Sequence, residues 1–219
     1  MTNWLEVWQR SDQFFSGLLL TLEVSLLALL MALVIGVFVA SMRVLDNKVL
    51  QFIGKWYVEF FQNTPLVIQV FFFYQGLPAL GVSLSEFTCG TFGLGIYTGA
   101  YIAEVFRAGI QSIPKGQWEA ARSQGFNYLQ TMSYVILPQA LRVSLPPLGN
   151  QIVNLVKNSA ILSAIAVADL MYNANIVSSD TFIVFEVYIF AAILYLCLTI
   201  PLSAIVEYME LRVAKGYHN

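Results

Sequence analysis

Polar side chains interrupt one apolar stretch of this chain at a spacing that could build a binding site. Asn150, Asn154 and Lys157 are separated by four and then three residues, so on a helix they lie near one face. Amide and ammonium groups donate hydrogen bonds. A lysine at the centre of a membrane helix costs roughly 2.5–3.5 kcal/mol, and such polar groups are functional candidates by default. This face therefore predicts a site for a polar solute.

Other polar residues could contribute to the same site. Asn158 and Ser159 directly follow Lys157, and Thr64 precedes Pro65 in a different apolar stretch. A proline inside a helix kinks it, and a polar, broken helix is tolerated in a membrane where it is buried in protein or lines a wet cavity. We therefore include Thr64, Asn158 and Ser159 among the candidates for a polar pathway.

Two carboxylates complete this set of candidates. Glu104 and Asp169 lie at the ends of apolar stretches, where either could accept hydrogen bonds from a cationic group. Glu104 could also pair with Arg107, three residues later on the same helix face. Alternatively, Lys157 pairs with Glu104 or with a partner subunit as a structural lock, and Asp169 contacts another protein near an outer end.

Motifs for catalysis, metal binding and nucleotide binding do not occur in the sequence. The one histidine, His218, stands in a hydrophilic tail, and neither Gly-x-Ser-x-Gly nor His-Glu-x-x-His is present. Cys89 and Cys197 lie in apolar runs without metal spacing, which predicts free thiols. The Gly54-Lys55 pair is followed by Trp56 and forms no P-loop. We expect no enzymatic activity, and no metal or cofactor bound by this chain.

The composition is typical of a membrane protein. Of the 219 residues, 58% are hydrophobic and 11% are charged, and the mean hydropathy is +0.70, whereas soluble domains are about 25% charged. This small number of charges cannot cover a surface that faces water. We therefore predict an all-α polytopic membrane protein with a single domain. The net charge of −2 excludes a general basic field for nucleic acid.

Five apolar stretches are candidates for membrane spans of about 20 residues each. They cover residues 16–42, 56–77, 87–108, 144–167 and 181–209. The second contains the polar break before Pro65, and the fourth opens with two prolines and carries the polar residues described above. A polar loop, residues 109–143, separates the third span from the fourth.

The positive charges predict the orientation of these spans. Segments 43–55 and 107–143, together with the C-terminal tail, carry all of the 11 lysines and arginines except Arg10 and Lys157. Because short loops rich in lysine and arginine stay in the cytoplasm, we expect the N-terminus outside, and the C-terminus and the polar loop in the cytoplasm.

The polar loop predicts two short helices. Pro114 is a start signal for a helix from about Lys115, and Gly125 would end or bend it. Asn127 is a suitable N-cap for a second segment, which we expect to stop before Pro138. Two such helices would form a compact knob anchored to spans on both sides, although an ordinary structured loop is an equal alternative.

The residues of this loop resemble the EAA loop of ABC-transporter permeases. The resemblance rests on Glu119-Ala120-Ala121, Gly125 and Leu137-Pro138. Other motifs look like the polar-amino-acid uptake subfamily of importers, namely Asn63–Leu66, Tyr97–Tyr101, Glu104–Ile110, Pro114–Gln117, Leu137–Ala140, Pro146-Pro147 and Lys157–Ser159.

This resemblance implies a type I ABC importer permease fold with five spans, in the bacterial cytoplasmic (inner) membrane. It also implies a second permease copy or paralogue, two ATPase subunits that hold ATP and Mg, and an extracytoplasmic amino-acid-binding protein. In that family the loop is a coupling helix that docks on the ATPase. The coupling role would therefore fall on Glu119, Ala120, Ala121, Gly125, Leu137 and Pro138.

The fourth span favours an acidic or amide amino acid (glutamate, aspartate or glutamine) as the substrate. Lys157 is flanked by amides, no acidic residue occurs from Leu145 to Ala168, and a basic substrate would require a carboxylate there. Lysine and asparagines could bind the carboxylate of an amino acid, and Glu104 or Asp169 its ammonium. A secondary carrier or channel is the alternative, but the chain shows no inverted repeat and such a protein would have no use for the knob.

Overall fold

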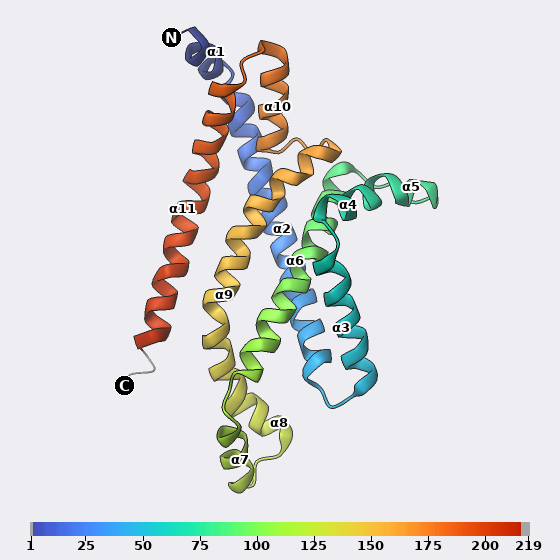
Figure 1. Ribbon diagram of the computed structural model, residues 1–219, viewed down its shortest axis with the longest axis vertical. Coiled ribbons are helices and arrows are strands. Elements are labelled where there is room, and N and C mark those ends of the chain that lie inside the picture. The colour runs from blue at the N-terminus through green and yellow to red at the C-terminus, as the bar shows by residue number, and fades with distance from the viewer. Residues whose placement is uncertain (1, 216–219) are drawn as a thin grey trace.

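The computed structural model describes residues 2–215 as helices joined by short turns (Figure 1). His218 and the end of the expected hydrophilic tail lie outside this range. In chain order the elements are α1 (Thr2–Gln9), α2 (Ser11–Val44), α3 (Lys48–Asn63), α4 (Leu66–Phe71), the π-helical η1 (Phe72–Gly76), α5 (Leu77–Ala79), α6 (Glu86–Gln111), α7 (Lys115–Ser123), α8 (Tyr128–Gln130), the π-helical η2 (Thr131–Ile136), α9 (Leu137–Asn158), the 3₁₀ helix η3 (Ser159–Ile165), α10 (Leu170–Thr181) and α11 (Phe185–Lys215).

Two helices of the described chain are long and apolar enough to cross a membrane by themselves, namely α2 and the part of α11 from Phe185 to Arg212. The helical segment Tyr128–Ile165 and α10 meet that criterion together, as one span broken by a bend of 48°. The central helix α6 coincides with the expected third span, but it is less apolar than α2 and α11. Its glycines and Thr98 are buried against other helices, so few of its side chains need to face lipid.

Helices α2 and α6 pack against each other through the bundle, and α9 packs against α6 and α11 (Figure 1). Small residues permit the close approach of α2 and α6. A Cβ atom at Gly99 would lie 3.0 Å from Cγ2 of Ile35, and one at Gly36 would collide with the side chain of Ile102. The glycines of the third span therefore serve helix packing, as expected of small residues in membrane helices.

The expected second span, residues 56–77, consists of more than one helix. Helix α3 already begins at Lys48, so the chain between α2 and α3 is shorter than expected, and Asn47 caps α3 by accepting from the amides of Val49 and Leu50. Thr64 and Pro65 then adopt extended conformations before α4 begins, because the residue before a proline is disfavoured in the helical region. The break expected at Pro65 is present.

The helix that follows the polar loop differs from the prediction. Helical structure continues from Tyr128 through α8, η2 and α9 to Asn158, so the expectation that the second segment stops before Pro138 is wrong. The π-helical turns of η2 precede this proline, and the amide of Leu137 donates to the carbonyl of Met132, five residues earlier. Pro138 has no amide hydrogen to donate, and the π-helical turns lie directly before it. The polar loop and the expected fourth span are thereby joined by one continuous helical segment from Tyr128 to Asn158, here called the rod.

The N-terminal end of α2 is tied to α10 and α11. Phe14, Leu170, Ala174 and Val177 belong to one buried apolar cluster. The guanidinium of Arg10 lies 3.1 Å from the Asp180 carboxylate. The region between the expected fourth and fifth spans is thus a packed helix, α10.

Candidate functional site

Helix α7 and the turn after it have the local structure that the sequence predicts. The helix begins at Lys115, immediately after Pro114. It ends at Ser123, and the φ of +88° at Gly125, two residues later, lies in the left-handed region that favours glycine. The amide of Phe126 donates to the carbonyl of Ala121 at 3.1 Å, and the amide of Gly125 to that of Arg122 at 2.9 Å, which is a Schellman motif.

The second segment of the loop begins with a capping box. The side chain of Asn127 accepts from the amide of Gln130 at 2.9 Å, and the side chain of Gln130 accepts from the amide of Asn127 at 2.9 Å. The expectation of an N-cap at Asn127 is confirmed. The two helical segments are therefore terminated by independent signals, which fixes the tight turn between them.

The residues of the coupling segment (115–138) divide into buried and exposed sets. Ala121 is buried, and the ring of Trp118 packs beside the buried cluster of Ile113, Ile136 and Ala140. Glu119, Ala120, Gly125 and Pro138 are exposed, and Leu137 is half-buried. One face of α7 therefore anchors the segment to the bundle, while the face that carries Glu119 and Ala120 remains accessible to another protein.

Helix α9, which continues from the coupling segment, makes a close contact with α6. A Cβ atom at Gly109 would collide with the Ser144 hydroxyl and would lie 3.1 Å from the carbonyl of Ala140. The Ser144 hydroxyl donates to the carbonyl of Val105 at 3.5 Å. Ala140 and Ser144 lie on the rod that continues from the loop, so this contact joins the rod to α6.

Polar side chains meet between α6 and α9, above this contact. An upper cavity of about 290 Å³ is lined by Tyr97, Thr98, Tyr101, Gln151, Asn154 and Asn158, together with Leu155. A lower cavity of about 480 Å³ shares Tyr101 and Gln151 with it and extends toward Gln62, Glu104 and Gly109. The two cavities form one polar groove along the α6–α9 face, which ends near the coupling segment.

The structure brings some of the candidate residues to this groove and leaves others outside. Asn154 and Asn158 line the upper cavity, and Glu104 lines the lower one. Asn150 and Lys157 are exposed and line neither cavity. Within the described part of the chain, Lys157 takes part in none of the ion pairs. The polar face of α9 is therefore rotated by one residue from the predicted face.

The hydroxyls of the two remaining polar candidates bond to their own helices. Thr64 donates to the carbonyl of Phe60 at 2.8 Å, and the buried Ser159 donates to the carbonyl of Val156 at 2.8 Å. Both hydroxyls satisfy backbone carbonyls near helix ends, and neither residue lines the polar groove.

The two candidate carboxylates are also engaged. Glu104 is paired with Arg43 of α2 and with Arg107, whose Nε lies 3.1 Å from both carboxylate oxygens. The expected local pair with Arg107 is present, whereas in this chain Glu104 does not pair with Lys157. Asp169 is fully buried and caps α10 by accepting from the amide of Tyr172 at 2.7 Å.

Sequence reasoning missed several residues of the groove. Tyr97, Thr98 and Tyr101 come from α6, and the hydroxyls of the two tyrosines lie 3.1 Å apart. Gln151 lies three residues before Asn154 and seven before Asn158, which places these amides on one helix face. That spacing was a usable signal, whereas the facing positions on α6 depend on how the two helices pack.

Comparison with known proteins identifies the family. Residues 32–215 match the family described as "Binding-protein-dependent transport system inner membrane component". The chain belongs to this family. The resemblance to ABC-transporter permeases of the amino-acid uptake type is thereby confirmed.

Relatives of the permease agree along nearly its whole length. It is 55% identical over 206 residues to the probable glutamine ABC transporter permease protein GlnM of Bacillus subtilis (strain 168), covering 94% of this chain and 95% of that protein. It is 39% identical over 195 residues to the putative glutamine transport system permease protein GlnP of Rickettsia bellii, covering 89% of each chain.

Solved structures show the same fold. A crystal structure of an amino acid ABC transporter with histidines superposes with a TM-score of 0.91 at 39% identity, covering 95% of this chain and 98% of that one. The MetNI methionine ABC transporter, in an inward-facing conformation, superposes with a TM-score of 0.76 at 20% identity. The fold is therefore that of the type I ABC importer permeases.

Proposed function

We propose that this chain is the membrane-spanning permease subunit of an ATP-driven importer of glutamine. The observation that carries the proposal is the polar groove between α6 and α9, because it lies on the rod that continues into the coupling segment. Residues that line the proposed solute path and the segment that would transmit movement from the ATPase thus belong to one continuous helical segment. The names of the similar permeases, several of which refer to glutamine, support the same conclusion.

The lining of the upper cavity favours an amide substrate over a charged one. Its polar groups are hydroxyls and amides, which both donate and accept hydrogen bonds. A cationic side chain bound there would be buried without a counter-charge, which is costly. The carboxylate of Glu104, in the lower cavity, is neutralised by Arg43 and Arg107. Of the substrates considered from the sequence, glutamine fits this lining best.

The membrane arrangement follows from the helices and the positive charges. We assign five spans, formed by α2, by α3 with α4, by α6, by α9 with η3, and by α11. The N-terminus lies outside, and the C-terminus and the coupling segment lie in the cytoplasm, because most lysines and arginines flank that side. The location is the bacterial cytoplasmic membrane. Two permease subunits, identical or paralogous, form the path together.

The exposed face of α7 is the proposed docking site for an ATPase subunit. Glu119 and Ala120 are free to contact a partner, while Ala121 and Trp118 hold the helix in place. The sequence contains no P-loop, so ATP and Mg would be bound and ATP hydrolysed by that partner. Closure of two ATPases moves the coupling segments, and the rod carries this movement to the α6–α9 groove, which opens alternately to a docked binding protein and to the cytoplasm.

Reconstitution with defined partners tests the proposal. The chain, its co-purified ATPase and its binding protein are placed in proteoliposomes, and uptake of labelled glutamine, glutamate, arginine and lysine is measured with and without ATP. We expect ATP-dependent uptake of glutamine. ATP-dependent uptake of arginine or lysine, with none of glutamine or glutamate, would refute the substrate assignment. Uptake by the chain alone would establish the secondary-carrier alternative.

A further inference from the structure

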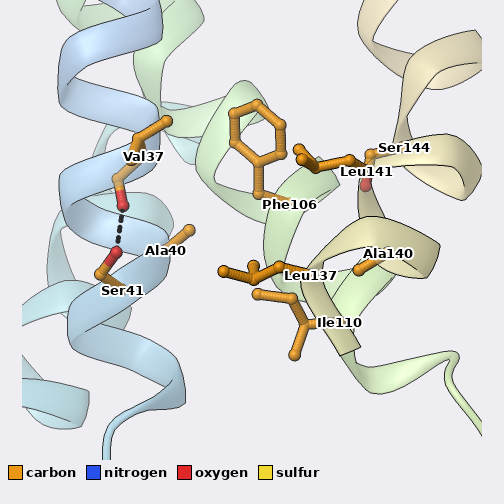
Figure 2. A pocket seen from close by; sticks show the side chains of 9 residues that line it. All are labelled: Val37, Ala40, Ser41, Phe106, Ile110, Leu137, Ala140, Leu141 and Ser144. Atoms are coloured by element: carbon orange, nitrogen blue, oxygen red, sulfur yellow. Dashed lines mark hydrogen bonds between the residues drawn. The ribbon is translucent and has the colours of Figure 1, made fainter. Parts of the chain in front are cut away.

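A second pair of cavities lies between α2 and α6, outside the polar groove. The first, here called the apolar pocket, has a volume of about 110 Å³. Figure 2 shows α2, α6 and α9 each contributing side chains to the same space, among them Val37, Ala40, Phe106, Ile110, Leu137 and Leu141. The Gly109–Ser144 contact between α6 and α9 separates this pocket from the lower cavity of the polar groove.

The apolar pocket offers almost no hydrogen bonding to a ligand. Its two hydroxyls are already engaged, since Ser41 donates to the carbonyl of Val37 at 2.8 Å (Figure 2) and Ser144 to that of Val105. A polar solute would lose its water there without compensation. Packing, rather than the hydrophobic effect, drives association within a membrane, and an unfilled groove forfeits dispersion contacts. A hydrocarbon chain is the occupant that suits this lining.

The second cavity has the opposite character and adjoins the first. It measures about 510 Å³ and is lined by Arg43, Gln51, Gln111, Lys115, Trp118 and Tyr128, together with apolar side chains that include Val44 and Ile110. Ile110 lines both cavities. On α2, Val37 and Ser41 of the first cavity continue to Val44 of the second at helical spacing. We call this second cavity the basic pocket.

The charges around the basic pocket favour an anion. Arg43 is engaged with Glu104, but in the described chain Lys115 takes part in none of the ion pairs. Burial raises the pKa of the Tyr128 phenol, and the negative charge of Asp46 raises it further. That phenol therefore stays a hydrogen-bond donor. The rings of Trp118 and Tyr128 are stacked, with centroids 6.2 Å apart, and such rings are typical of the membrane–water interface.

We propose that these two cavities together bind one anionic glycerophospholipid. An acyl chain fills the apolar pocket between α2, α6 and α9, and the phosphate lies in the basic pocket near Lys115. The bound lipid thereby touches α2, the rod and α7 at once, and it holds the coupling segment at a fixed position relative to the bundle. This site is separate from the polar groove, so its occupancy regulates coupling without contacting the transported solute.

Native mass spectrometry of the full chain in detergent tests the head-group part of the proposal. The chain is titrated with dioleoyl-phosphatidylglycerol and with dioleoyl-phosphatidylcholine, which share their acyl chains. We expect preferential retention of one phosphatidylglycerol. Lys115→Gln should weaken that retention about fivefold, since one basic residue near an anionic lipid surface contributes about that factor. Lys48→Gln, a matched exposed lysine on the first turn of α3 that lines neither cavity, should leave it unchanged.

A second pair of variants tests the acyl-chain part. Leu141→Trp should fill the apolar pocket and reduce retention of both lipids, whereas Leu145→Trp, one turn later on the same exposed side of α9, should not. Equal retention of the two lipids, or an unaltered Lys115→Gln variant, would overturn the proposal. Displacement of the lipid by millimolar sn-glycerol-3-phosphate would assign the site to free phosphate esters instead. Loss of the lipid when the ATPase is bound would assign the basic pocket to that partner.

Discussion

The two sides of helix α6 are built in opposite ways. Toward α2, the backbones approach closely at Gly36, Gly95 and Gly99, and the apolar pocket on this side is small. Toward α9, tyrosines and a threonine face amides across cavities of about 290 and 480 Å³. The first contact is rigid because close-packed apolar surfaces have few alternative arrangements. The second contains polar groups and free volume, so it can change shape or admit a solute. Helix α6 thus lies between a close-packed contact with α2 and a polar groove that contains free volume.

The largest predicted effect comes from breaking the rigid side. A leucine at Gly95 would collide with Met31, and its Cβ would lie 3.2 Å from the carbonyl of Ala28, so Gly95→Leu should lower the free energy of unfolding by about 3 kcal/mol or more. The midpoint of thermal aggregation in detergent measures this. The control is Gly116→Ala on α7, where an added Cβ has no neighbour within 4 Å. Its stability should be unchanged or slightly raised.

The next prediction concerns the turn that connects α7 to the rod. Gly125→Asp should leave the chain inserted but abolish at least about 90% of ATP-driven uptake, because the added charge stands on the exposed docking face at a left-handed position. Gly125→Asn is the matched control, since asparagine tolerates that conformation and carries no charge. Normal uptake by the aspartate variant would contradict the role of the coupling segment.

A third prediction compares two positions on α9. Asn154→Leu removes an amide from the lining of the upper cavity and should raise the KM for glutamine uptake about tenfold, since a solute group left without its hydrogen-bonding partner costs about 1–3 kcal/mol. Asn150→Leu, one turn earlier and outside the lining of the upper cavity, should change it less than about twofold. Uptake kinetics in proteoliposomes measure both. A larger effect at Asn150 would restore the polar face predicted from the sequence.

The smallest effect is expected at the break between α3 and α4. The hydroxyl of Thr64 donates to the carbonyl of Phe60 in its own helix, and the kink itself is set by Pro65. Thr64→Val should therefore leave the KM for glutamine unchanged and shift the free energy of unfolding by about 1 kcal/mol or less. A severalfold rise in KM would place Thr64 in the solute path after all.

Local features of the fold were predictable from the sequence. The start of α7 after Pro114, its end before Gly125 and the cap at Asn127 were all foreseen. Proline, left-handed glycine and capping side chains act within one turn of helix, so neighbouring residues decide them. Pro138 was misjudged because its effect depends on the π-helical turn before it, which changes the hydrogen-bond register and is not encoded by the proline alone.

The polar groove was only partly predictable, for a geometric reason. Asn154 and Asn158 were identified because amides stand out in an apolar span. Lys157 was favoured on the same ground, but it lies on the exposed side of α9. A shift of one residue turns a side chain by about 100° around a helix. The choice of face depends on which helix packs against α9, and that information is distributed along the chain.

The sequence by itself identified a helical membrane permease with an EAA-type loop and no nucleotide-binding motif, and it predicts that this loop is cytoplasmic. These properties depend on composition, on short-range signals and on motifs, which are local. Only the tertiary structure decided that the coupling segment and α9 are one rod, that Glu104 is held by Arg43 and Arg107, and that tyrosines of α6 face amides of α9. These are contacts between residues far apart in the chain, and their geometry is fixed by how the helices pack.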